Sequence, residues 1–236
     1  MDGIINLCKP RGISSFRALS IVKRRLQLKK VGHLGTLDPA ACGVLVLLCG
    51  RATKLTNQLH APTKVYRTLL VWGEETDTLD NEGQVVATSK IIPTVTQIQA
   101  VLPSMIGELQ IEVPKYSAVH IQGKRAYELA RQGIDFSPPT KTVMITRFDM
   151  LDTAQCVRDL AALGENFHLP AHASYFEIEC QTGTYIRSLA KVLATRLGTV
   201  ATAAVILRTR VGNFSLEQSR SLDSVQLDDL QPIKEI

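Results

Sequence analysis

Asp38 is the residue whose type and surroundings most clearly suggest chemistry. It is the only acid between residues 3 and 73, and it lies in a stretch, 32–43, with three glycines and one proline. That composition is typical of an irregular loop. Neighbouring cations favour the ionised form of a carboxylate, and an ionised carboxylate with no second acid nearby suits a nucleophile or an electrostatic stabiliser. Taken alone, Asp38-Pro39 also fits a turn or a helix cap.

The cations of the chain are concentrated around this loop. Residues 1–73 contain 12 of the 27 Lys and Arg but only two of the 22 Asp and Glu, a net charge of +10, so the rest of the chain carries −5. A one-sided positive field attracts polyanions, and nucleic acid is the usual partner. A solvated basic face without a partner is the alternative. Arg24 and Arg25 fit either interpretation.

Composition excludes several other classes of protein. The chain has 236 residues, 45% of them hydrophobic, and a mean hydropathy of +0.06, which predicts a folded core. No apolar run approaches the roughly 18 residues of a membrane span, and the N-terminus does not resemble a signal peptide, so we expect a cytoplasmic protein. Five cysteines without a C-x-x-C pair do not support a disulfide framework or a zinc site. Asp77 and Asp80 predict a turn closed by Gly83 rather than a magnesium site.

The elements that must position Asp38 are of both types. We expect strands at 3–7, 44–49, 65–72, 174–180 and 201–210, and helices at 14–28, 95–106, 124–132 and 184–197. The order is not a strict strand–helix–strand alternation, which favours an α+β fold with a mixed, mainly antiparallel central sheet flanked by helices and loops. The acidic last twenty residues are expected to pack lightly on the surface.

Five blocks of the sequence resemble, in the same order, the motifs of the TruB family of pseudouridine synthases. They are residues 9–15, 32–45, 64–67 with 73–83, 113–118 with 123–131, and 183–189 with 208–214. The resemblance spans residues 3 to about 215. It implies the pseudouridine synthase fold and the isomerisation of uridine 55 in the T-arm of tRNA, without a cofactor or a metal.

The resemblance also implies roles for individual residues. Asp38 matches the nucleophile, Tyr66 the tyrosine that stacks on the flipped uridine, and Arg187 the arginine that pairs with the aspartate. Stacking on Tyr66 would return about 1–3 kcal/mol of the cost of flipping the base. The other residues expected to contact the substrate are Lys9, His33, Tyr185, Ile206 and Arg208. Whether Asp38 attacks C1′ or C6, and which group removes the C5 proton, stays open.

The family pattern also predicts the domain organisation. Residues 1–215 would form the catalytic domain, with an RNA-binding insertion at about 117–140, and 216–236 would be a short tail. The PUA-like C-terminal domain of most bacterial members is expected to be absent. We therefore expect a monomer that binds the T-arm of tRNA through its catalytic domain, in a salt-sensitive manner, without guide RNA or membrane.

Three alternatives differ in class. An RNA-binding and folding module with dispensable catalysis is disfavoured by the intact Asp38, Tyr66 and Arg187. A guide-dependent synthase, similar to the dyskerin relatives, is disfavoured by the expected absence of the C-terminal domain. A hydrolase built on Asp38 and His33 would lack a second catalytic carboxylate or a metal.

Overall fold

The computed structural model describes residues 1–56 and 63–233, which form two compact units. The first unit contains residues 1–67 and 206–236, and the second contains residues 68–205. Strands β4 (Thr63–Trp72) and β12 (Ala201–Val211) contribute to both units, because the division falls within them. Each unit is described by itself below.

The first unit is a small mixed sheet. Besides parts of β4 and β12, its strands are β1 (Gly3–Lys9), β2 (Val31–Leu34), β3 (Cys42–Cys49), β13 (Phe214–Ser215) and β14 (Arg220–Ser221). The sheet is built around β3: β1 and β2 pair with it in antiparallel fashion and β12 pairs with it in parallel. Every residue of β3 is buried, which explains its almost continuous apolar sequence. Two short 3-10 turns, η1 (Gly50–Leu55) and η3 (Leu227–Asp229), complete the unit.

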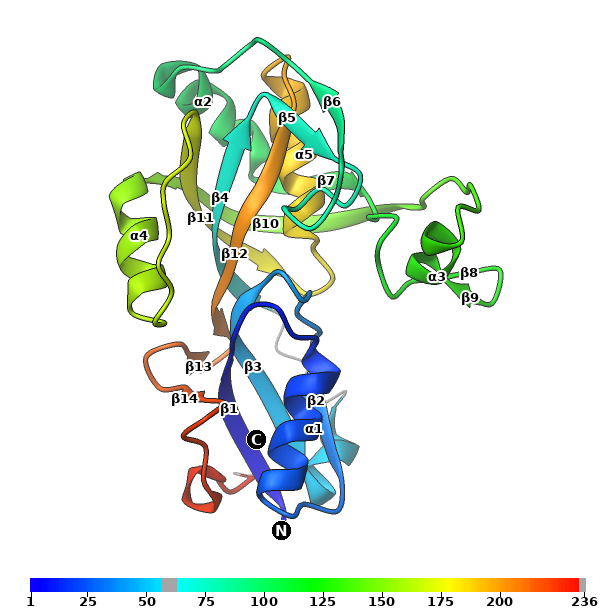
Figure 1. Ribbon diagram of the computed structural model, residues 1–236, viewed down its shortest axis with the longest axis vertical. Coiled ribbons are helices and arrows are strands. Elements are labelled where there is room, and N and C mark those ends of the chain that lie inside the picture. Colours follow the sequence, from blue (N-terminus) through cyan, green and yellow to red (C-terminus); the bar gives the residue numbers. More distant parts are fainter. Residues whose placement is uncertain (57–62, 234–236) are drawn as a thin grey trace. The chain divides into compact units, whose positions relative to one another are not determined.

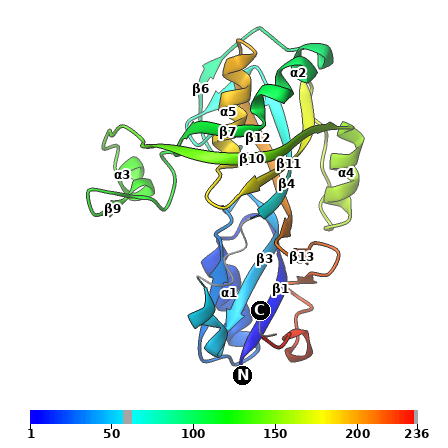
Figure 2. The ribbon, with the colours of Figure 1, turned by 180° about the vertical axis from the view of Figure 1, so that it is seen from behind.

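Helix α1 (Ser15–Arg25) covers one face of β1 and β3, as the two opposite views show (Figures 1 and 2). The Ser14 hydroxyl caps it by accepting a hydrogen bond from the backbone N–H of Arg17. Ala18, Leu19 and Val22 form its buried stripe. The helix begins where the sequence predicts and ends earlier than residue 28.

The second unit contains a sheet with the strand order β12-β4-β11-β10-β7, in which β7 (Gly107–Glu112), β10 (Thr140–Leu151) and β11 (Ala173–Gln181) are new. Two separate two-stranded sheets pair β5 (Glu74–Thr76) with β6 (Val85–Thr88) and β8 (His120–Ile121) with β9 (Lys124–Arg125). Its helices are α2 (Val95–Val101), η2 (Leu102–Met105), α3 (Ala126–Arg131), α4 (Thr153–Ala161) and α5 (Ile186–Arg196). The ring of Phe176 packs edge-on against Trp72 and Phe148 in its core, with centroids 6.5 and 5.5 Å apart.

A segment with α3, β8 and β9 projects from the ends of β7 and β10 of its own unit (Figure 1). It lies between Glu112, where β7 ends, and Thr140, where β10 begins. A projecting segment therefore exists at the position predicted for the insertion. Its role in RNA binding stays a prediction.

The structure confirms the α+β class with a mixed sheet and corrects two expectations. The single helix expected at 95–106 is α2 followed by η2, which contains Pro103. The C-terminal residues do not pack lightly: β14 pairs with β1, and the N–H of Gln231 donates to the carbonyl of Ile4 at 2.9 Å. Val225 is almost fully buried. Within the described ranges, no helix is long and apolar enough to cross a membrane.

Candidate active site

Asp38 lies on the loop between β2 and β3, partly exposed to solvent. The carbonyl of Asp38 accepts a hydrogen bond from the N–H of Ala41 at 3.1 Å, so the loop turns here, as Asp38-Pro39 predicts. The N–H of Gly12 donates to the carbonyl of Pro39 at 2.9 Å. The backbone on both sides of Asp38 is therefore fixed.

Ser15 holds the residue before Asp38. Its hydroxyl donates to the carbonyl of Leu37 at 2.9 Å and accepts from the N–H of Leu37 at 2.8 Å. Ser15 and Leu37 are both buried. This reciprocal pair ties the first turn of α1 to the backbone next to the carboxylate.

Lys9 holds the residue after Asp38. Its ammonium is fully buried and donates to the carbonyls of Pro10 at 2.8 Å, Ile13 at 2.7 Å and Pro39 at 3.5 Å. A buried ammonium is costly unless hydrogen-bonded, and these carbonyls supply the partners. In this position Lys9 exposes no surface to RNA, so its contribution is to position the loop.

Arg208 holds the residues of the loop that precede Asp38. It is fully buried, and its guanidinium donates to the carbonyls of Gly35 at 3.0 Å, Thr36 at 3.3 Å and Val44 at 2.8 Å. The guanidinium carbon lies 6.0 Å from the centre of the Tyr66 ring. Arg208 thus links the Asp38 loop to Tyr66.

Gly43 permits this close approach. It pairs with Arg208 across the parallel strands β3 and β12, and its φ is +100°. A Cβ at residue 43 would lie 2.2 Å from the carbonyl oxygen of Arg208. Only glycine adopts this conformation at this separation without strain.

Two apolar pocket candidates lie in the same unit. Tyr66 on β4 and Ile206 on β12 are 7% and 6% exposed, so a small face of each reaches the surface. Cys42, at the start of β3, approaches the carbonyl of Ile206 with its Sγ at 3.8 Å. Asp38, Tyr66 and Ile206 thus all lie in the first unit, and their grouping around a substrate stays a prediction.

His33 is partly exposed, on β2. Burial, followed by the positive charge of Arg208, lowers the pKa of the His33 ring. Its Nδ1 is buried without a hydrogen-bond partner among the described residues. The lowered pKa favours the neutral ring, and its Nδ1 is enclosed by protein atoms.

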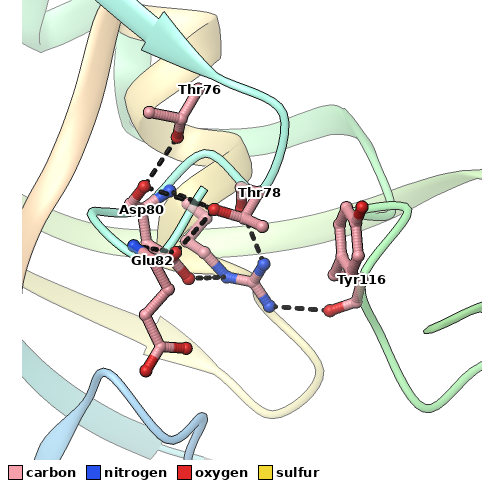
Figure 3. Close-up of polar contacts among 6 residues, drawn as sticks. Thr76, Thr78, Asp80, Glu82 and Tyr116 are labelled. Carbon is pink, nitrogen blue, oxygen red and sulfur yellow. Dashed lines mark hydrogen bonds and ion pairs between the residues drawn. The ribbon is translucent and has the colours of Figure 1, made fainter. Parts of the chain in front are cut away.

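Arg187 lies in the second unit, in the first turn of α5. Figure 3 shows Thr78, Asp80 and Tyr116 converging on one guanidinium, that of Arg187. It donates to the carbonyls of Thr78 at 2.8 Å and Tyr116 at 3.0 Å, and its Nε lies 3.6 Å from Oδ2 of Asp80. Asp80 is itself held, because its Oδ1 accepts from the Thr78 hydroxyl at 2.6 Å. This cluster fixes the orientation of the guanidinium within the second unit.

Tyr185 precedes Arg187 as the N-cap residue of α5 and is partly exposed. Asp38 belongs to the other unit, so the pairing of Arg187 with Asp38 stays a prediction. Sequence reasoning missed Ser15 and Asp80 as parts of the site. Asp80 lies in the block 73–83 and is only 4% exposed. Its burial distinguishes it from Asp77, and burial cannot be seen in the sequence.

Comparison with known proteins places the chain in a family. The family model described as "TruB family pseudouridylate synthase (N terminal domain)" matches residues 23–186, which include Asp38 and Tyr66. The chain belongs to the TruB family. It is 39% identical over 226 residues to tRNA pseudouridine synthase B of Caulobacter vibrioides, covering 96% of this chain and 68% of that protein. It is 35% identical to the Alkaliphilus oremlandii protein of the same name, covering 99% and 73%.

A solved structure shares the fold of this TruB family member. A chain from the crystal structure of a Cbf5-Nop10-Gar1 complex superposes with a TM-score of 0.66 at 26% identity. The match covers 94% of this chain and 52% of the solved chain, so this chain spans about half of its length. The family and the fold therefore agree with the resemblance of the five sequence blocks.

Proposed function

We propose that this chain is a tRNA pseudouridine synthase that isomerises uridine 55 of the T-arm, with Asp38 as the nucleophile. The observation that carries the proposal is the anchored loop. Ser15, Lys9 and Arg208 hold the backbone around Asp38, and Asp38 itself is partly exposed. Such fixation suits a nucleophile, because catalysis requires a group held within a fraction of an ångström.

The uridine must leave the RNA stack before a carboxylate reaches it, which costs a few kcal/mol. We propose that Tyr66 stacks on the flipped base, beside Ile206. Tyr185 borders the same pocket, and neutral His33 holds the RNA that the base has left. Exclusion of water by the bound base and the buried Tyr66 and Ile206 would protect the intermediate from hydrolysis.

The proposed reaction is a rearrangement within one nucleotide. Asp38 attacks the sugar at C1′ or the base at C6, and the uracil is detached or loosened from the ribose. The base rotates in the closed pocket, and C5 bonds to C1′ in place of the lost N1–C1′ bond. The C5 proton leaves to a base or to solvent, and N1 takes up a proton. Asp38 is then released, so the reaction needs no net addition of atoms or electrons.

Arg187 is proposed to pair with the carboxylate of Asp38 when RNA is bound. Its held guanidinium supports this role, since a preoriented cation loses little freedom on pairing. Lys9 and Arg208 are proposed to position the loop rather than to contact RNA. We propose that the chain acts on tRNA as a monomer in the cytoplasm, without a guide RNA, cofactor or metal.

Tritium release tests this function directly. A tRNA transcript carrying 5-tritiated uridine is incubated with the wild-type chain, with Asp38→Asn and with Asp38→Ala. A transcript in which uridine 55 is replaced by cytidine serves as the control. We expect the wild type to release the tritium of one uridine per tRNA, and both variants and the control RNA to release none.

Three results would overturn the proposal or part of it. Release from the control transcript would refute uridine 55 as the target, and turnover by Asp38→Ala would refute the nucleophile. A wild-type chain that binds tRNA but releases no tritium would favour an RNA-binding module.

A further inference from the structure

The exposed face of α1 carries cations that the proposed chemistry does not use. Arg17, Lys23 and Arg24 lie on the helix, and Lys29 and Lys30 follow it. All five side chains are exposed. None of them forms an ion pair with any residue that the structure describes, and no acid lies between residues 3 and 37.

Exposed cations elsewhere in the described residues are mixed: some pair with an acid, and others, such as Lys90 and Arg158, do not. Several pair with an acid at hydrogen-bond distance, namely Arg51 with Asp2, Lys115 with Asp135, Arg147 with Glu177 and Arg220 with Asp229. A merely solvated helix usually mixes charges in this way, because like charges on neighbouring turns repel. The uncompensated charge of α1 therefore indicates an anionic partner.

Arg25 clarifies which cations belong to this face. It donates from its guanidinium to the carbonyl of Leu222, so the C-terminal segment holds it. Arg24 has no such contact and remains in solvent. The two adjacent arginines, indistinguishable in the sequence, thus have different surroundings.

The helix geometry arranges the face in two columns. Residues seven apart lie within about 20° of each other around a helix. Phe16 is thus aligned with Lys23, and Arg17 with Arg24. Phe16 is 74% exposed, which is unusual for a phenylalanine. An exposed aromatic ring beside cations is the pattern of surfaces that stack on bases and track phosphates.

The position of α1 connects this face to the reaction. Ser15, at the start of the helix, contacts the backbone of Leu37, next to Asp38. Lys23 lies eight residues further, about 12 Å along the helix axis. The cationic face therefore begins beside the Asp38 loop and continues along α1.

We propose that the exposed face of α1, with Lys29 and Lys30, is a second RNA-binding surface. It would bind the phosphate backbone of the substrate RNA beyond the nucleotide that Asp38 attacks, with Phe16 stacking on an unpaired base. This inference rests on the proposed function, since it takes the RNA to be the substrate tRNA. The proposal would account for part of the excess positive charge of residues 1–73 as contacts with RNA phosphates.

Equilibrium binding of a fluorescently labelled tRNA transcript at several salt concentrations tests the surface. The Asp38→Ala chain is the common background, so that the RNA stays chemically unchanged. Lys23→Ala/Arg24→Ala and Lys29→Ala/Lys30→Ala each remove two cations from the surface. Lys90→Ala/Arg158→Ala removes two exposed cations from the second unit and is the matched control. Alanine favours helices, so the variants on α1 keep their fold.

Each phosphate contact on a duplex contributes about 0.9 to the slope of log K against log salt. We therefore expect each surface pair to reduce the slope by about 1.8 and to weaken binding about tenfold or more at 0.1 M salt, and the control pair to change neither. Phe16→Ala should lose about fivefold in affinity and Phe16→Tyr should retain it. Unchanged slopes in both surface pairs, or an equal change in the control, would overturn the surface.

Tritium release by the wild-type chain separates this inference from the proposed function. If tritium is released and the surface pairs bind tRNA like the control, only the second surface is refuted. If the slopes depend on the surface pairs and no tritium is released from any RNA, the surface stands as an RNA-binding face and the proposed reaction is refuted.

Discussion

Replacing Ser15 by alanine should damage catalysis out of proportion to stability. The substitution removes two buried hydrogen bonds between Ser15 and Leu37. Each is worth about 0.5–1.5 kcal/mol net, and alanine recovers a few tenths through helix propensity, so we expect a loss of about 2 kcal/mol. In a chain of this size that lowers Tm by about 4–8 °C.

The loss of catalysis is expected because Leu37 directly precedes Asp38. Without the Ser15 hydroxyl, the backbone beside Asp38 loses the partner of both its N–H and its carbonyl. A displacement of about 1 Å at a reacting group costs about a hundredfold in rate. We expect kcat for tritium release at saturating tRNA to fall about 10–100-fold.

Ser14 supplies the matched control. Its hydroxyl caps the same helix through the N–H of Arg17 and makes no contact with Leu37. Ser14→Ala should cost about 1 kcal/mol of stability and leave kcat within about twofold of the wild type. The reasoning fails if Ser15→Ala is destabilised but keeps its kcat, or if Ser14→Ala loses as much kcat as Ser15→Ala.

Three other outcomes are expected. Asp80→Asn, which removes the charge paired with Arg187 inside the second unit, should cost about 3–5 kcal/mol in urea unfolding and lower kcat; an unchanged midpoint and rate would contradict that role. The pKa of His33 in the folded chain lies below its usual value of 6.5, so just below pH 6.5 the unfolded chain binds more protons than the folded chain. The free energy of unfolding should therefore fall as the pH drops from 6.5, and it should fall more steeply than in His33→Gln. An equal pH dependence of the free energy of unfolding, measured in urea for both chains, would refute this. Burial raises the pKa of the Cys49 thiol to about 11, so at pH 8 very little of it is thiolate. Iodoacetamide at pH 8 should therefore modify the partly exposed Cys8 before Cys49. Mass spectrometry that shows Cys49 labelled as early as Cys8 would contradict this expectation.

The sequence predicts the parts of the site that depend on local features. Asp38 stands out because its type, its isolation from other acids and the surrounding glycines are all visible within a dozen residues. The buried strand β3 and helix α1 are predicted for the same reason, since their apolar patterns are strong and continuous. In β10 the buried residues alternate with exposed polar ones only in part, and this strand was missed.

The roles of the buried cations could not be predicted. Whether Lys9 or Arg208 binds a phosphate or its own backbone depends on how residues far apart in sequence meet. Arg208 reaches the loop only because β12 pairs with β3 beside Gly43, 165 residues away in the chain. Lys9 is buried only because Pro39 lies beside the end of β1. Sequence identifies such residues as cations, and the fold decides their partners.

The buried cations Lys9 and Arg208 and the exposed cations of α1 have different electrostatic effects. In the proposed reaction, a carboxylate nucleophile and a polyanionic RNA would repel each other, so the loop that carries Asp38 would need positive charge nearby. Backbone carbonyls accept hydrogen bonds from the buried Lys9 and Arg208, and in the proposed complex the positive charge of both would act on the RNA through the loop. The exposed cations of α1 remain screened by salt, whereas the buried ones are screened much less. Raising the salt concentration should therefore lower the affinity for tRNA far more than it lowers kcat at saturating tRNA. An equal loss of affinity and of kcat would indicate that the exposed cations act in the catalytic step.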